Sequence, residues 1–253
     1  MTSSTPYPAA HYATQVNAAR ASADAVAGMV MSLLAPTSVL DVGCGAGAWL
    51  AAFRDLGATD VYGIEGGHPD PAQLQVRPEQ IRALNLEREF DLGRRFDLAV
   101  TVEVAEHLPA RSADGFVRSL TRHADAVLFS AAVPEQGGDW HLNEQWPDYW
   151  YSRFAEHGFA CFDVLRRQVW NDPDVDWWYR QNVLLYATGA AADRLHAAGA
   201  SAEPAAPLPL IHPELFWQAR RQAERDLGLR ETLRMFPRAV RNRVAQARAA
   251  RGR

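Results

Sequence analysis

The stretch Val39-Leu40-Asp41-Val42-Gly43-Cys44-Gly45-Ala46-Gly47 decides the fold of this chain. Its apolar first half predicts a buried strand, and Ala48 to Phe53 behind the glycines predicts a helix. Glycine at 43, 45 and 47 allows positive φ and lets a ligand lie against bare backbone. The helix points its amide dipoles back at the turn. Asp41 stands two residues before the first glycine, and Glu65 ends the next apolar run, where an acid can accept both hydroxyls of a ribose.

This pattern resembles the class I S-adenosylmethionine (SAM) methyltransferases. Asp41 to Gly47 is similar to the first motif of that family, and Glu65 stands at its ribose-binding acid. The alternative is an NAD-binding Rossmann domain, but the Asp41 prefix is not part of the dinucleotide fingerprint. The resemblance implies SAM as the cofactor and an α/β, Rossmann-like, seven-stranded doubly wound sheet with an N-terminal cover helix. The implied cofactor-binding residues are Asp41, Gly43, Cys44, Gly45, Gly47, Glu65, Asn85, Leu86 and Val102.

Composition sets the class of protein. The 253 residues are 48% hydrophobic, which suffices for a buried core, and the net charge of −4 attracts no nucleic acid globally. Residues 214–253 nevertheless hold 11 Arg against 4 acids, and this basic tail suggests a homodimer or an anionic partner. Two cysteines exclude a disulfide framework, and we find neither a signal peptide nor an apolar run long enough to span a bilayer. We expect a cytoplasmic protein.

Alternating periodicities divide the chain into a methyltransferase domain (1–188), a linker rich in Ala, Gly and Pro (189–209) and a basic helical extension (210–253). A cover helix is predicted over Ala18 to Leu34, and two helices in the extension over Pro213 to Leu227 and Leu229 to Arg253. The predicted strands are Ser38–Val42, Val61–Glu65, Gln80–Leu86, Phe96–Val102, Ala126–Ala132, Ala160–Arg166 and Asn182–Thr188.

Glu103, Glu106 and His107 follow the fourth predicted strand. On a helical turn they share one face and form a divalent-metal half-site, with Mg²⁺ or Mn²⁺ favoured by the carboxylates and Zn²⁺ admitted by the nitrogen. The Glu-x-x-Glu-His pattern resembles ubiquinone-biosynthesis O-methyltransferases and small-RNA 2′-O-methyltransferases, in the latter of which a metal holds the substrate hydroxyls. The alternative is a metal-free turn in which these residues cap and pack.

The polar loop after the fifth strand should face the transferable methyl group. His141 is the candidate general base, with His107 as its substitute, because an unperturbed imidazole titrates near neutral pH. His141 can also be a fourth metal ligand. Asn143, Glu144 and Gln145 offer hydrogen bonds to a polyol, and Glu144 can instead cap the next helix.

Trp177, Trp178 and Tyr179 lie between the last two strands, and as loop aromatics they would stack on a sugar ring, on bases or on a dimer partner. The alternative is that half of the aromatics in this region belong to the core. We therefore expect SAM-dependent O-methylation of a saccharide or glycosylated small molecule, assisted by a divalent metal. Two alternatives remain. One is an RNA 2′-O-methyltransferase that uses the Arg-rich tail, although nucleic acid is disfavoured by the acidic body. The other is a non-enzymatic scaffold, which would not need the glycines or Glu65.

Overall fold

Strand β1 (Ser38–Val42) is an inner strand of a seven-stranded sheet with the order β3-β2-β1-β4-β5-β7-β6. The other strands are β2 (Asp60–Glu65), β3 (Ile81–Ala83), β4 (Leu98–Val102), β5 (Ala126–Ser130), β6 (Ala160–Phe162) and β7 (Leu184–Ala187). Strand β7 runs antiparallel to both of its neighbours, whereas the remaining pairs are parallel. The computed structural model describes residues 9–67 and 69–226, with side chains from 19 to 223 except 68. The predicted α/β sheet is confirmed.

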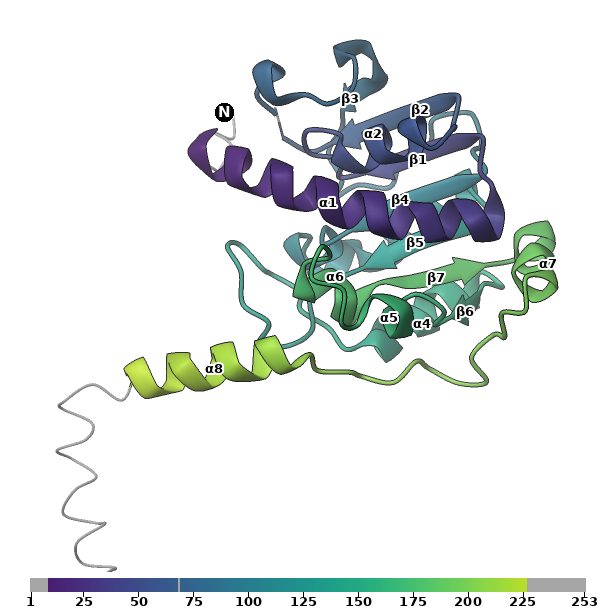
Figure 1. Cartoon of the computed structure of the whole chain (residues 1–253). Coiled ribbons are helices and arrows are strands. Elements are labelled where there is room, and N and C mark those ends of the chain that lie inside the picture. Colours follow the sequence, from purple (N-terminus) through teal and green to yellow (C-terminus); the bar gives the residue numbers. More distant parts are fainter. Residues whose placement is uncertain (1–8, 68, 227–253) are drawn as a thin grey trace, which may run out of the picture. The chain divides into compact units, whose positions relative to one another are not determined.

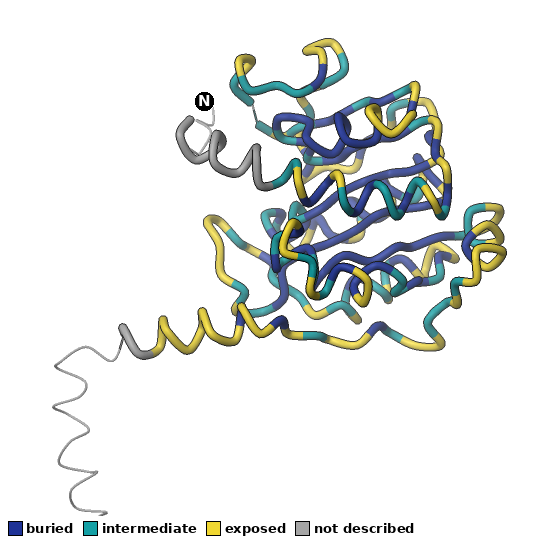
Figure 2. The backbone as a smooth tube through the Cα atoms, viewed as in Figure 1, coloured by how far each residue is buried: buried dark blue, intermediate teal, exposed yellow. Residues whose placement is uncertain are grey.

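The strands are apolar on both faces, which is why they read as continuous hydrophobic runs. In β1, Val39 joins one buried cluster and Leu40 joins the other, and β5 alternates in the same way. The first cluster is completed by the helices over Ala9–Leu34, Ala48–Asp55, Arg166–Val169, Trp177–Asn182 and Gly189–Ala197, and the second by those over Ala113–His123 and Pro147–Glu156. The sheet is thus covered on both sides, as the continuous dark strands of Figure 2 show.

Figure 1 shows how the helices are arranged around the sheet. Their bounds are α1 (Ala9–Leu34), α2 (Ala48–Asp55), α3 (Ala113–His123), α4 (Pro147–Glu156), α5 (Arg166–Val169), α6 (Trp177–Asn182), α7 (Gly189–Ala197) and α8 (Pro213–Asp226). Short 3-10 helices occupy Pro71–Gln73, Pro78–Gln80, Ala105–His107 and Ala110–Ser112. No helix among the described residues is both long and apolar enough to cross a membrane.

The domain boundaries differ from those predicted. Residues 189–209 are not a plain linker, because α7 forms within them and buries Leu195 in the core. The chain divides into two units after His212 rather than after residue 209. The second unit begins with α8, most of whose described side chains are exposed (Figure 2). The second predicted helix of the extension, Leu229 to Arg253, lies outside the described residues.

Candidate active site

The glycine turn joins β1 to α2 at the carboxyl end of the sheet. Gly45 has φ 51°, and a Cβ built on it would meet nothing within 4 Å. The backbone there is therefore open to a ligand. The carboxylate of Glu65, at the end of β2, accepts hydrogen bonds from the backbone N–H groups of Gly45 and Gly67, each at 2.8 Å. Glycines 43 and 47 serve packing as well, because a Cβ at either would collide with Val104 or Val76.

Asp41 lies beneath the turn and is almost fully buried. Its Oδ2 accepts no hydrogen bond from the described residues. Burial raises the pKa of Asp41 well above its usual value, and the nearby negative charge of Glu65 adds to this. A buried acceptor without a donor beside an open glycine turn fits a ligand that brings positive charge, as the sulfonium and amino groups of SAM would.

The other predicted cofactor residues differ in burial. Val102 ends β4 and is buried, and so are Leu86 and Cys44. Burial also raises the pKa of the Cys44 thiol, which makes it unreactive. Asn85 is exposed, and its Oδ1 accepts the backbone N–H of Glu87 at 2.9 Å in a local turn. The structure brings Asp41, the glycines and Glu65 together, whereas Asn85 lies two residues beyond β3, which is shorter than predicted.

Glu106, His107 and His141 form one group at the ends of β4 and β5. One potential ligand atom from each lies within 4.8 Å of the other two, and the imidazole centroids are 4.9 Å apart. Both Glu106 carboxylate oxygens are buried, and neither accepts a hydrogen bond from the described residues. Burial, reinforced by the charge of Glu103, raises the pKa of Glu106 well above its usual value. A buried carboxylate in this state is suited to a proton or a metal cation.

The predicted metal trio needs a correction at Glu103. The chain turns sharply there, with φ 53° at a non-glycine residue, and only residues 105–107 form a helical turn. The Glu103 carboxylate accepts amide hydrogens from Gln136 (2.8 Å) and Asn182 (3.1 Å). It does not belong to the group of potential ligands, and His141 takes its place. Sequence reasoning missed Gln136 and Asn182, because their role depends on segments that meet only in the fold.

The loop between β5 and α4 is fixed around the two histidines. The carbonyl of Glu106 accepts the N–H groups of Leu142 (2.7 Å) and Asn143 (2.9 Å). Burial lowers the pKa of His107, as does neighbouring His141, while a hydrogen bond from the His107 ring to the carbonyl of Trp140 opposes this. The loop thereby sets the orientation of the His107 ring through the carbonyl of Trp140.

Glu144 organises this loop from within. Its carboxylate accepts hydrogen bonds from His141 Nδ1 (2.8 Å) and from the N–H groups of Glu135 and Gly137. Because a carboxylate only accepts, the proton of a neutral His141 sits on Nδ1 and Nε2 is left as its basic nitrogen. These bonds occupy Glu144, which argues against its predicted contact with a substrate.

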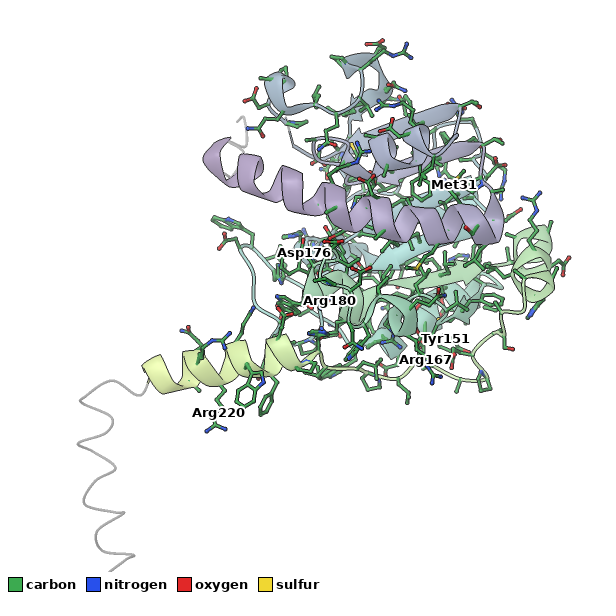
Figure 3. The ribbon with its side chains drawn as sticks, in the orientation of Figure 1. Met31, Tyr151, Arg167, Asp176, Arg180 and Arg220 are labelled. Carbon is green, nitrogen blue, oxygen red and sulfur yellow. The ribbon has the colours of Figure 1, made fainter. Side chains whose placement is uncertain are left out.

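The remaining predicted substrate residues are only partly available. Asn143 is buried and its Oδ1 accepts an amide hydrogen from Gln145 at 2.9 Å. Trp177 and Tyr179 are each only 8% exposed and lie in helix α6 rather than in a loop. Asp176, labelled in Figure 3, precedes this helix, and its backbone N–H donates to Ser22 of α1 at 2.9 Å. The prediction of three stacking aromatics is therefore wrong for Trp177 and Tyr179, which belong to the interior, and only Trp178 is partly exposed.

Comparison with known proteins identifies the family. The chain is 34% identical over 105 residues to ribosomal protein L11 methyltransferase of Laribacter hongkongensis (strain HLHK9), covering 39% of this chain and 34% of that protein. It is 32% identical over 80 residues to ubiquinone biosynthesis O-methyltransferase of Methylobacterium nodulans (strain LMG 21967 / CNCM I-2342 / ORS 2060), covering 28% and 30%. The alignments thus span about a third of each curated relative.

Solved structures show the same fold. SAM-bound CalS10, an amino pentose methyltransferase from Micromonospora echinaspora involved in calicheamicin biosynthesis, superposes with a TM-score of 0.53 at 15% identity, covering 75% of this chain and all of that one. A family model described as a methyltransferase domain matches residues 12–170, more than half of the chain. The resemblance to class I methyltransferases is thereby confirmed, and this chain belongs to the methyltransferase domain family.

Proposed function

We propose that this protein transfers the methyl group of SAM to a hydroxyl of a saccharide or glycosylated small molecule. Three features support the donor: the open backbone at Gly45, the Glu65 carboxylate beside it, and the buried, unpaired oxygen of Asp41. A scaffold would not need these features. CalS10, described as an amino pentose methyltransferase, makes a sugar acceptor compatible with the fold.

The observation that carries the acceptor chemistry is the unpaired carboxylate of Glu106 beside two imidazoles. An alcohol is a poor nucleophile and needs help to lose its proton. Glu106, His107 and His141 would hold a divalent cation, and two nitrogen ligands favour a transition metal such as Zn²⁺ or Fe²⁺ over the Mg²⁺ expected from the sequence. When bound, such a cation lowers the pKa of the acceptor hydroxyl.

Neighbouring residues of the chain orient the two histidine rings and the Glu103 carboxylate. Glu144 fixes His141 through Nδ1, and the carbonyl of Trp140 fixes the ring of His107, which are the outer contacts that imidazole ligands require. Gln136 and Asn182 hold Glu103 beside Glu106. If no cation binds, the same His141–Glu144 pair serves as a general base, because the carboxylate stabilises the imidazolium that forms.

The test is methyl transfer from labelled SAM to a panel of methyl glycosides and an RNA 3′ end. Metal content is measured on the same samples, and activity is assayed with and without excess chelator. We expect transfer to a glycoside, loss of activity on chelation, and loss of bound metal in Glu106→Gln. His141→Ala should lower turnover by about 10²–10⁴ without changing SAM affinity. His157→Ala, which removes an exposed histidine at the end of α4, is the matched control.

The outcomes separate the alternatives. Full activity in chelator together with an inactive His141→Ala enzyme would reject the metal and assign His141 as the base. Methyl transfer to RNA but to no glycoside would show that the substrate is RNA and not a saccharide. If both chelation and His141→Ala leave activity intact, the acceptor is not a hydroxyl.

A further inference from the structure

Large apolar side chains are exposed in the loop that carries His141. Trp140 is 62% exposed, Leu142 is 64% exposed, and Trp146 is also exposed. Exposed apolar side chains that gather in one loop beside a candidate active site mark a binding surface more often than a packing defect. The sequence pointed instead to the aromatics of α6, two of which the fold buries.

The backbone at Trp140 is strained. Its φ is 66°, a left-handed conformation that is unfavourable for a bulky residue. The exposed indole gains little from packing, so packing does not explain the choice of tryptophan over glycine at this position. The carbonyl oxygen of the same residue accepts a hydrogen bond from the His107 ring, and the residue precedes His141. The position of the indole is thus tied to the two histidines.

The charge of the loop restricts the chemical class of ligand that it can bind. Between Glu135 and Trp146 it contains three acids and no Arg or Lys. The loop therefore offers no arginine or lysine to a phosphate-bearing acceptor such as a nucleotide. A neutral ring with an apolar face and hydroxyl groups fits both the exposed indole and the acidic neighbours.

We propose that Trp140 is an acceptor-binding residue whose indole packs against the ring of a neutral sugar and so selects it as substrate. This inference rests on the proposed function and names the residue that recognises the acceptor. Trp140 acts in binding, and the chemical step belongs to the histidine group.

The experiment compares Trp140→Ala, Trp140→Phe and Trp140→Gly in the full chain. Trp217→Ala is the matched control, since Trp217 is a tryptophan of α8 with 50% exposure. Trp140→Ala should raise KM for a methyl glycoside about tenfold, with kcat at saturation and KM for SAM unchanged. Trp140→Phe should retain most of the affinity, and Trp217→Ala should behave as wild type. Saturation-transfer NMR measures glycoside binding independently of turnover.

Trp140→Gly separates binding from structure. Glycine accommodates the positive φ, so this variant should melt at a higher temperature than wild type and still bind the glycoside as weakly as Trp140→Ala. A variant that loses both heat stability and binding would assign Trp140 a structural role and overturn the proposal. Equal KM values for Trp140→Ala and Trp217→Ala would also overturn it.

The two proposals fail in different ways. If wild type binds methyl glycosides through Trp140 but methylates none of them, the proposed function is wrong and the assignment of Trp140 holds. If wild type methylates a sugar and Trp140→Ala has an unchanged KM, only the role of Trp140 is wrong. A preference for phenols over glycosides in the NMR experiment would overturn the sugar class.

Discussion

Gly45 and Gly189 share the same backbone angle, φ 51°, and an added Cβ at either would meet nothing within 4 Å. They differ in what lies around them. Gly45 stands in the turn between β1 and α2 beside Glu65, and Gly189 begins α7. Comparing the same substitution at both positions therefore distinguishes the cost of backbone strain from the loss of a ligand contact.

We predict that Gly45→Ala and Gly189→Ala destabilise the fold equally, by about 1–2 kcal/mol, because each places a Cβ in the left-handed region. Only Gly45→Ala should lose SAM binding, because its methyl group fills the space where the ligand meets backbone. Thermal melting with and without SAM measures both effects. Equal ligand-induced stabilisation of the two variants would remove the glycine turn from the binding site.

At this scale, local motifs were predictable and long-range contacts were not. The glycine turn and Glu65 each end or follow a strand of one βαβ unit, so the sequence pattern placed both although they are 20 residues apart. Glu103 and His141 exchanged places in the potential metal group because the chain turns at Glu103. Nothing in the local pattern indicates that Asn182 reaches Glu103 from 79 residues away.

Among the elements, β1 and β4 are joined at their amino ends by Asp97. Its Oδ2 accepts hydrogen bonds from the N–H and hydroxyl of Thr37 at 2.8 and 2.7 Å and from the N–H of Ser38 at 3.0 Å. Burial by itself would raise the pKa of Asp97, but these hydrogen bonds outweigh it and lower the pKa below its ordinary value. The carboxylate thus stabilises the start of the central strand pair.

We predict that Asp97→Asn lowers the stability at pH 7 by about 1 kcal/mol, a value reduced for the exposure of this side chain. A depressed folded-state pKa contributes stability above the unfolded pKa and loses it as pH falls through the folded value. The stability difference between wild type and Asp97→Asn should therefore shrink below about pH 4. Melting curves from pH 7 to pH 2 measure it, with Glu156→Gln, an exposed acid of α4, as the control. A constant difference across this range would contradict the assignment.

Strand prediction succeeded where burial is two-sided. Strand β1 has the predicted bounds, and β2, β4 and β5 keep the predicted core residues, because each lies between two partners. The edge strands β3 and β6 are shorter than predicted, and so is β7, although it lies between two partners. The Ala-rich composition of the expected linker concealed helix α7. Leu195 is the one residue of this helix that is fully buried in the core.

The whole molecule combines an acidic unit with a basic one. With a net charge of −4 overall, the 11 Arg and 4 acids of residues 214–253 give that segment +7 and leave −11 for the rest. We propose that the tail of one chain binds the acidic unit of a second copy, because opposite charges of this size attract at low ionic strength.

Deleting residues 213–253 should then convert a dimer into a monomer, while SAM binding by the first unit is retained. Light scattering at low salt measures the mass of both chains, and high salt should dissociate the full-length dimer. If the full chain and the truncated chain are both monomeric at low salt, the tail has no role in self-association.

The hydrogen bond from Asn182 to Glu103 also sets an order in time. Its partners are 79 residues apart, so at about 5–20 residues per second a ribosome makes Glu103 roughly 4–16 seconds before Asn182. The glycine turn, β2 and β4 are complete before this interval begins. The nascent chain therefore contains the glycine turn and Glu65 before it contains the amide that holds Glu103. A chain that ended before residue 182 would leave Glu103 without this partner.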